Sequence, residues 1–176
     1  MNNDIIPNYI KPYFDINKNH LTILTAGIYE SSLYGKLKTI IKEYNNKIRV
    51  AFLPGYSGVK VRLTAVSELV SNNDFLKFKK QIESKIKKYV YGYNDDKLNE
   101  VLGKVLIENK KTLAVAESCT GGYLSKIITD IPGSSMYYKG GIVAYDNDIK
   151  INILNVKNSI ISKYGAVSKQ VASIMS

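Results

Sequence analysis

The stretch from Leu113 to Gly122, LAVAESCTGG, carries the densest set of reactive side chains in the sequence. After four apolar residues and before two glycines it places an acid, two hydroxyls and a thiol: Glu117, Ser118, Cys119 and Thr120. Residues 123–131 then show the apolar periodicity of a helix. A buried strand, a small polar turn and a helix start present hydroxyls and free backbone N–H groups, which suit an anionic or oxyanionic ligand.

A serine nucleophile in this turn needs a base, and the sequence restricts the choice. The single histidine, His20, lies in the other half of the chain and is most simply the start of a strand. A Ser-His-Asp or Cys-His site is therefore hard to build, and one histidine with one cysteine does not supply a usual zinc set. Lysine is the remaining candidate, and Lys150 lies one turn into the helix expected after Tyr145.

The position of these two residues favours a shared site with Ser118. If the strands that contain Ala116 and Ala144 are parallel neighbours, the turns after them lie at the carboxyl edge of one sheet, where α/β proteins bind ligands. Spacing alone leaves alternatives open. Ser118 or Thr120 as a helix cap with a solvated Lys150 is one, and Cys119 as the nucleophile is another.

The elements expected in the first half form a compact α+β unit of order β-α-β-β-α, judged from apolar periodicity and turn residues. Strands are expected at 20–28, 48–53 and 59–66, and helices at 30–44 and 74–89, the second capped by Asn72 or Asn73. Residues 54–58 are expected to form a hairpin loop of about five residues. Its Gly55 and Gly58 make a GxxG, which clamps nucleic acid when it joins two helices, but here an ordinary strand turn is favoured.

The elements of the second half form an α/β layer with strands that read as buried. Strands are expected at 112–117 and 141–145, and helices at 96–108, 123–131, 146–154, 157–164 and 168–176. Residues 90–94 read as a boundary. The expected organisation is therefore a lead-in at 1–19, an α+β domain at 20–93 and part of an α/β domain at 94–176.

Composition narrows the function class. The 176 residues carry a net charge of +10, but only Arg49 and Arg62 are arginines and the lysines are spread along the chain, so nucleic acid is an unlikely partner. One cysteine excludes an intrachain disulfide and fits a reducing compartment. No apolar run has transmembrane length and no signal peptide is visible, so a cytoplasmic location without membrane association is expected.

Several ordered motifs resemble the CinA (competence/damage-inducible protein A) family. They are 116–122 (AESCTGG), 129–135 (TDIPGSS), 140–145 (GGIVAY), Lys150 and 165–168 (GAVS). Upstream, residues 27–31 (GIYES), 53–54, 61–65 (VRLTA) and 91–92 resemble the middle, KH-like domain of that family. The resemblance covers nearly the whole chain and implies a KH-like α+β domain followed by an incomplete three-layer α/β/α domain.

The resemblance also implies an activity, the hydrolysis of nicotinamide mononucleotide to nicotinate mononucleotide and ammonia without a metal or cofactor. It assigns Ser118 as the nucleophile, Lys150 as the general base and Tyr145 as the assisting group. The residues implied to lie beside the nucleotide are Glu117, Thr120, Gly121 and Gly122. A homodimer is the expected assembly, and a nucleic-acid-binding KH-like module without catalysis is the alternative function.

Relative to the family, the chain is expected to be truncated at both ends. The larger N-terminal domain, which resembles molybdopterin-binding proteins, has no counterpart in the sequence. The later part of the deamidase domain, with a glycine-rich segment and a late arginine, also has none. The resemblance therefore predicts weak or no amidase activity from these 176 residues alone.

Overall fold

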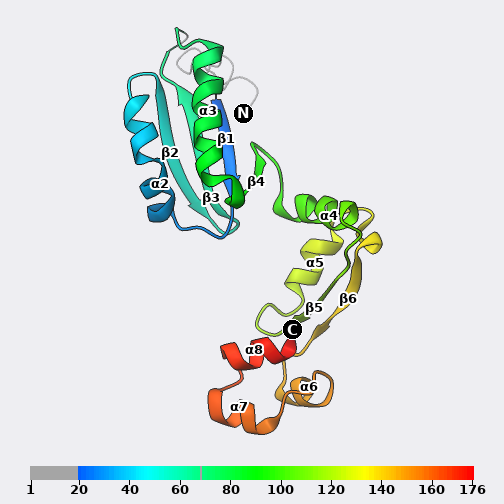
Figure 1. Cartoon of the computed structure of the whole chain (residues 1–176). Coiled ribbons are helices and arrows are strands. Elements are labelled where there is room, and N and C mark those ends of the chain that lie inside the picture. The colour runs from blue at the N-terminus through cyan, green and yellow to red at the C-terminus, as the bar shows by residue number, and fades with distance from the viewer. Residues whose placement is uncertain (1–19, 68) are drawn as a thin grey trace, which may run out of the picture. The chain divides into compact units, whose positions relative to one another are not determined.

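The computed structural model describes residues 20–67 and 69–176, and these form two compact units that divide between Leu98 and Asn99 (Figure 1). The predicted lead-in at 1–19 lies outside the described residues. Among those described, no helix is both long and apolar enough to cross a membrane.

The first unit is a four-stranded antiparallel sheet with two helices. Its elements are β1 (His20–Thr25), α2 (Glu30–Glu43), β2 (Ile48–Gly55), β3 (Gly58–Ala65), α3 (Asn72–Ile86), a 3-10 turn at Lys87–Tyr89 and β4 (Val90–Tyr93). The strand order is β2-β3-β1-β4 (Figure 1). The unit is thus an α+β fold with an antiparallel sheet, as predicted.

The core of this unit follows from the period-2 pattern of β3 and the period-3.6 pattern of the helices. Val61 and Leu63 of β3 are fully buried, whereas Lys60 and Arg62 between them are exposed. Helices α2 and α3 bring their buried faces to the same side of the sheet, including Leu37 and Phe78. One face of the sheet is therefore packed under helices, and the other carries the polar residues of β2 and β3.

The structure corrects three expectations in this unit. Residues 90–93, for which no strand was expected, form the edge strand β4, paired with β1 through Ile23 and Tyr93. The hairpin loop is two residues long, because β2 and β3 stay paired as far as Gly55 and Gly58. Helix α3 is capped by Ser71, whose Oγ accepts a hydrogen bond from Asp74 N at 3.1 Å, rather than by an asparagine.

The second unit has a two-stranded parallel sheet, and one short helix packs against both strands. Its elements are α4 (Leu98–Glu108), β5 (Leu113–Glu117), α5 (Tyr123–Thr129), a 3-10 turn at Ser134–Met136, β6 (Tyr138–Val143), α6 (Asn147–Asn152), α7 (Asn158–Tyr164) and α8 (Lys169–Met175). Strands β5 and β6 pair directly (Figure 1). This is the α/β part of the predicted mixed fold, so the predicted fold class is confirmed.

The expected burial of these strands is wrong. Only Glu117 of β5 is buried, and no residue of β6 is. Parallel sheets are normally buried because helices cover both of their faces, whereas β5 and β6 form a two-stranded sheet on their own among the described residues. Strand β6 also begins and ends earlier than predicted, so Tyr145 lies two residues beyond its end.

Candidate functional site

The carboxyl edge of the β5–β6 pair brings the two predicted turns together. Glu117 at the end of β5 is in register with Val143 at the end of β6, and Ala144 N donates to Glu117 O at 2.7 Å. The two strands are parallel neighbours, as the sequence argument required. Ser118 therefore leaves the sheet beside the segment that leads to Tyr145.

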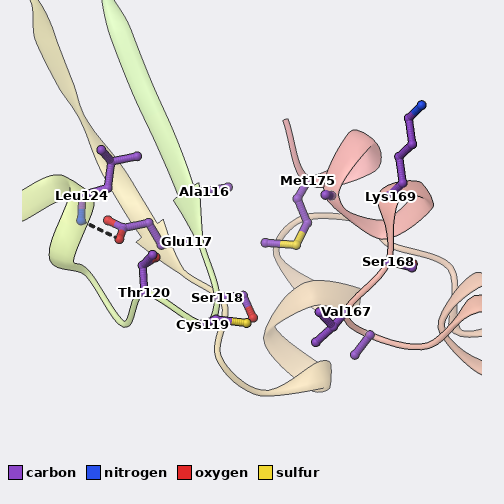
Figure 2. Close-up of a pocket in the computed structure, with 12 residues that line it drawn as sticks. Ala116, Glu117, Ser118, Cys119, Thr120, Leu124, Val167, Ser168, Lys169 and Met175 are labelled. Atoms are coloured by element: carbon purple, nitrogen blue, oxygen red, sulfur yellow. Dashed lines mark hydrogen bonds between the residues drawn. The ribbon is translucent and has the colours of Figure 1, made fainter. Parts of the chain in front are cut away.

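A cavity of about 520 Å³ opens at this edge (Figure 2). One wall consists of the end of β5, the turn after it and the start of α5; the other consists of α8 and the turn before it. The lining residues that the sequence singled out are Glu117, Ser118, Cys119 and Thr120, opposite Ala166, Val167, Ser168, Lys169, Ala172 and Met175. In Figure 2, Ser118 and Cys119 point to the side of the turn that faces Val167 and Met175.

Four predicted site residues do not line this cavity: Gly121, Gly122, Tyr145 and Lys150. The role of the two glycines lies in their backbone conformation. Gly121 has φ 58° and Gly122 φ 95°, conformations that glycine adopts at little cost. These two residues turn the chain from β5 into α5. Gly122, with no side-chain hydrogen bond, is the N-cap of α5, so the alternative of Ser118 or Thr120 as that cap is wrong.

The Glu117 side chain accepts hydrogen bonds from N–H groups at the start of α5, as the side chain of an N-cap residue would. Its carboxylate is 3% exposed and accepts hydrogen bonds from Leu124 N at 2.9 Å and Ser125 N at 2.8 Å. The Ser125 hydroxyl donates a third at 2.6 Å. Figure 2 shows the side chain directed at α5 and away from Val167. These contacts hold the turn against the helix, and Glu117 also lines the cavity.

The same contacts determine the ionisation of Glu117. Burial acts to raise its pKa, but the hydrogen bonds from the Ser125 hydroxyl and from the N–H groups of Ser125 and Leu124 outweigh burial, and Thr120 adds another. The net effect lowers the pKa from 4.5 to about 2. Glu117 is therefore an anion at neutral pH whose charge is compensated within the protein.

Sequence reasoning missed Ser125, Tyr138 and Gly141, which complete this arrangement. Tyr138 Oη donates to Ser125 Oγ at 2.7 Å. A Cβ on Gly141 would lie 2.6 Å from Tyr138 Oη and 2.7 Å from Ser125 Oγ, so only glycine leaves room for the pair. A glycine inside a strand is the sequence signal that marks such a close approach.

Lys150 is almost fully buried, at 2% exposure, so the alternative of a solvated lysine is wrong. Its Nζ donates to the carbonyl oxygens of Ala144 at 2.7 Å, Tyr145 at 2.8 Å and Asp146 at 3.4 Å. An ammonium group has three protons to donate, and each has a backbone acceptor here. Lys150 thus fixes the segment between β6 and α6, while the Tyr145 side chain is 74% exposed.

Comparison with known proteins gives two adjoining family matches. Residues 20–92 match the Damage-inducible protein CinA KH domain, and residues 95–176 match the CinA C-terminal domain. A CinA-like protein of Amoebophilus asiaticus is 42% identical over 160 residues, which cover 88% of this chain and 38% of that protein. A CinA-like protein of Thermotoga neapolitana is 45% identical over 145 residues, which cover 81% and 35%.

Solved structures of similar proteins include a CinA superfamily protein from Escherichia coli. It is 35% identical, with coverage of 44% of this chain and 45% of that one and a TM-score of 0.44. The chain spans less than half the length of the curated relatives above. Because the two family matches follow one another in order along residues 20–176, the chain belongs to the CinA family.

Proposed function

We propose that the second unit supplies the nucleophile of an amidohydrolase that acts on nicotinamide mononucleotide. The observation that supports it is the position of Ser118. This half-buried serine follows a parallel strand at the carboxyl edge of the sheet, on the wall of a cavity of about 520 Å³. A cavity of this size is within the usual range for small-molecule sites, about 300–1,000 Å³.

The proposed reaction proceeds through an ester of Ser118. The serine oxygen attacks the carboxamide carbon of the nicotinamide and its proton passes to a base. The base gives this proton to the amide nitrogen, and the carbon–nitrogen bond breaks to release ammonia. Water then attacks the ester carbon, which frees the nicotinate carboxylate and restores the serine hydroxyl. The sum is amide plus water to carboxylate plus ammonium.

Lys150 is the proposed base, and the structure indicates what that role requires. Its Nζ is bound to three carbonyls and does not line the cavity. To accept a proton from Ser118, Nζ must first lose one of its three protons, which frees one of these carbonyls, and must turn toward the serine. Tyr145, exposed in the segment that Lys150 holds, is proposed to assist once that segment moves.

The proposed orientation of the substrate follows the two walls of the cavity. Ser118 and Thr120 belong to the wall at the end of β5, where the carboxamide would lie. Lys169, exposed on the opposite wall, offers a cation for the phosphate. The wall residues Val167 and Met175 provide apolar surface for the pyridine ring.

The test measures ammonia release from nicotinamide mononucleotide. We expect weak or no release by the chain itself, and release by a chimera in which the corresponding continuation of the Thermotoga neapolitana relative follows Ser176. Ser118→Ala should abolish turnover in the chimera, whereas Cys119→Ala, a change in the adjacent residue of the same wall, should preserve it. Full turnover in Ser118→Ala would show that the nucleophile is another group.

A further inference from the structure

Basic residues that are separated in the sequence lie together on the face of the first unit's sheet that the helices do not cover. The strand register places Arg62 of β3 opposite Ala51 of β2, Lys60 opposite Leu53 and Thr64 opposite Arg49. Positions in direct register point to the same face, so Arg49, Lys60 and Arg62 share the face opposite helices α2 and α3. We call these three residues the basic face.

The basic face contains both arginines of the chain. All three side chains are exposed, and none makes an ion pair with another described residue. The strands β1 to β4 contain no Asp or Glu at all. Lys47, two residues before Arg49, differs from these three residues because its Nζ forms an ion pair with Asp74 at 3.0 Å.

The two ends of the basic face provide further contact surface. At the hairpin tip, Tyr56 is fully exposed in the two-residue loop between Gly55 and Gly58. At the other end, Arg49 lines a cavity of about 420 Å³ together with Asn45 and Asn46. An exposed ring, a row of cations and amide groups are the elements of a surface that stacks bases and contacts phosphates.

From these observations we propose that the basic face binds single-stranded nucleic acid, with the phosphate backbone along β2 and β3 and a base stacked on Tyr56. The fold thereby answers one of the two sequence arguments against such a partner, scattered charge, and it places both arginines of the chain on the same face. Arginine suits phosphate because its planar fork donates two parallel hydrogen bonds. The surface differs from a GxxG clamp between helices, since Gly55 and Gly58 lie in a β-hairpin.

The test uses fluorescence anisotropy of a labelled oligo-dT and oligo-rU with the full chain. Three phosphate contacts predict that log K falls with log salt with a slope of about −2, since each contact contributes about −0.7 for single strands. The variant Arg49→Gln/Lys60→Gln/Arg62→Gln should weaken binding at least tenfold in low salt and flatten the slope. Circular dichroism of this variant should match that of the parent, because all three side chains are exposed.

The matched control removes the same amount of charge elsewhere. Lys36, Lys38 and Lys87 are exposed on α2 and the 3-10 turn, and their triple change to Gln should leave affinity and slope nearly unchanged. Tyr56→Ala should weaken binding at least fivefold, because stacking on one aromatic side chain contributes about that much or more.

Four results would overturn the proposal. One is that no oligonucleotide binds the full chain at low salt. A second is equal weakening in the two triple variants, which would indicate attraction by net charge alone. A third is unchanged affinity in Tyr56→Ala, since contacts with phosphates only would hold a duplex equally well. The fourth is tighter binding of poly-glutamate than of either oligonucleotide, which would indicate an acidic polypeptide as the partner.

Discussion

Ser125 Oγ donates to Glu117 Oε1 at 2.6 Å, and this contact joins the start of α5 to the end of β5 directly beneath the turn that carries Ser118. Ser125 Oγ also accepts from Tyr138 of β6 at 2.7 Å. Both strands of the small parallel sheet and the following helix therefore meet at one hydroxyl. The positions of Ser118 and of its neighbours in the turn depend on this junction.

The first prediction concerns pH and Glu117. Because the pKa of Glu117 is lowered from 4.5 to about 2 in the folded protein, its ionised form contributes stability at and above pH 4.5. That contribution is lost as the pH falls from 4.5 toward 2. Glu117→Gln removes the titrating group, so the difference in melting temperature between parent and variant should be large at pH 7 and should shrink below pH 4.5.

Thermal unfolding followed by circular dichroism checks this prediction. Asp130→Asn is the control, because Asp130 is exposed and pairs with Lys126 only at the surface. A difference between parent and Glu117→Gln that stays constant from pH 7 to pH 3 would contradict the assignment.

The second prediction concerns the Tyr138 hydroxyl. Tyr138→Phe removes one neutral hydrogen bond to Ser125 and should lower the free energy of unfolding by about 1 kcal/mol. Ser125→Ala should cost more, because it removes the bonds to both Tyr138 and the Glu117 carboxylate. The double variant should cost less than the sum of the single ones, since they share a bond. Strict additivity in denaturant unfolding would show that the two hydroxyls do not interact.

Local patterns predicted the parts of the fold that are governed by local rules. The alternation of Val59, Val61 and Leu63 correctly identified β3, and the apolar repeat of residues 30–44 correctly identified α2. Strand β4 was missed because its four residues include Gly92, which reads as a break in an isolated sequence. In the sheet, Gly92 is needed because a Cβ there would lie 2.7 Å from the Asp96 side chain.

The candidate site was predictable only as far as chain order and strand pairing determine it. That Ser118 and Tyr145 follow parallel neighbours could be inferred from the βαβ pattern, and the pairing is confirmed. The hydrogen-bond partners of Glu117 and Lys150 could not be inferred from the sequence. These side-chain contacts depend on how the backbone is oriented, for Glu117 by the φ angles of Gly121 and Gly122 and by the short helix α5. That Arg49 and Arg62 lie on the same face of the sheet likewise could not be inferred without the register of β2 with β3.

The third prediction concerns Gly141. In Gly141→Ala the new Cβ would lie 2.6 Å from Tyr138 Oη, 2.7 Å from Ser125 Oγ and 2.8 Å from Val115 Cγ2. Overpacking of this kind costs about 1–3 kcal/mol, so the second unit should lose that much stability. Adding Tyr138→Phe, which removes the atom closest to the Cβ, should recover part of the loss.

Gly35 gives a control of opposite sign. It lies within α2, and a Cβ there would meet no atom within 4 Å. Gly35→Ala should therefore stabilise the first unit by about 0.5–1 kcal/mol through its helix preference. If Gly141→Ala proves as harmless as Gly35→Ala in unfolding experiments, the close approach of Ser125 Oγ and Tyr138 Oη to Gly141 is wrong.

The last prediction separates the structural role of Lys150 from its proposed catalytic one. Lys150→Met keeps the length of the side chain but leaves the carbonyls of Ala144 and Tyr145 without their donor, so the free energy of unfolding should fall by about 2 kcal/mol. Lys163→Met, at an exposed position of α7, should have almost no effect.

Lys150→Arg retains the charge and a donor to the carbonyls, so it should recover part of the stability. It should not recover ammonia release in the chimera, because arginine is not deprotonated at neutral pH. Recovery of both by Lys150→Arg would assign Lys150 a positioning role and require another base for Ser118.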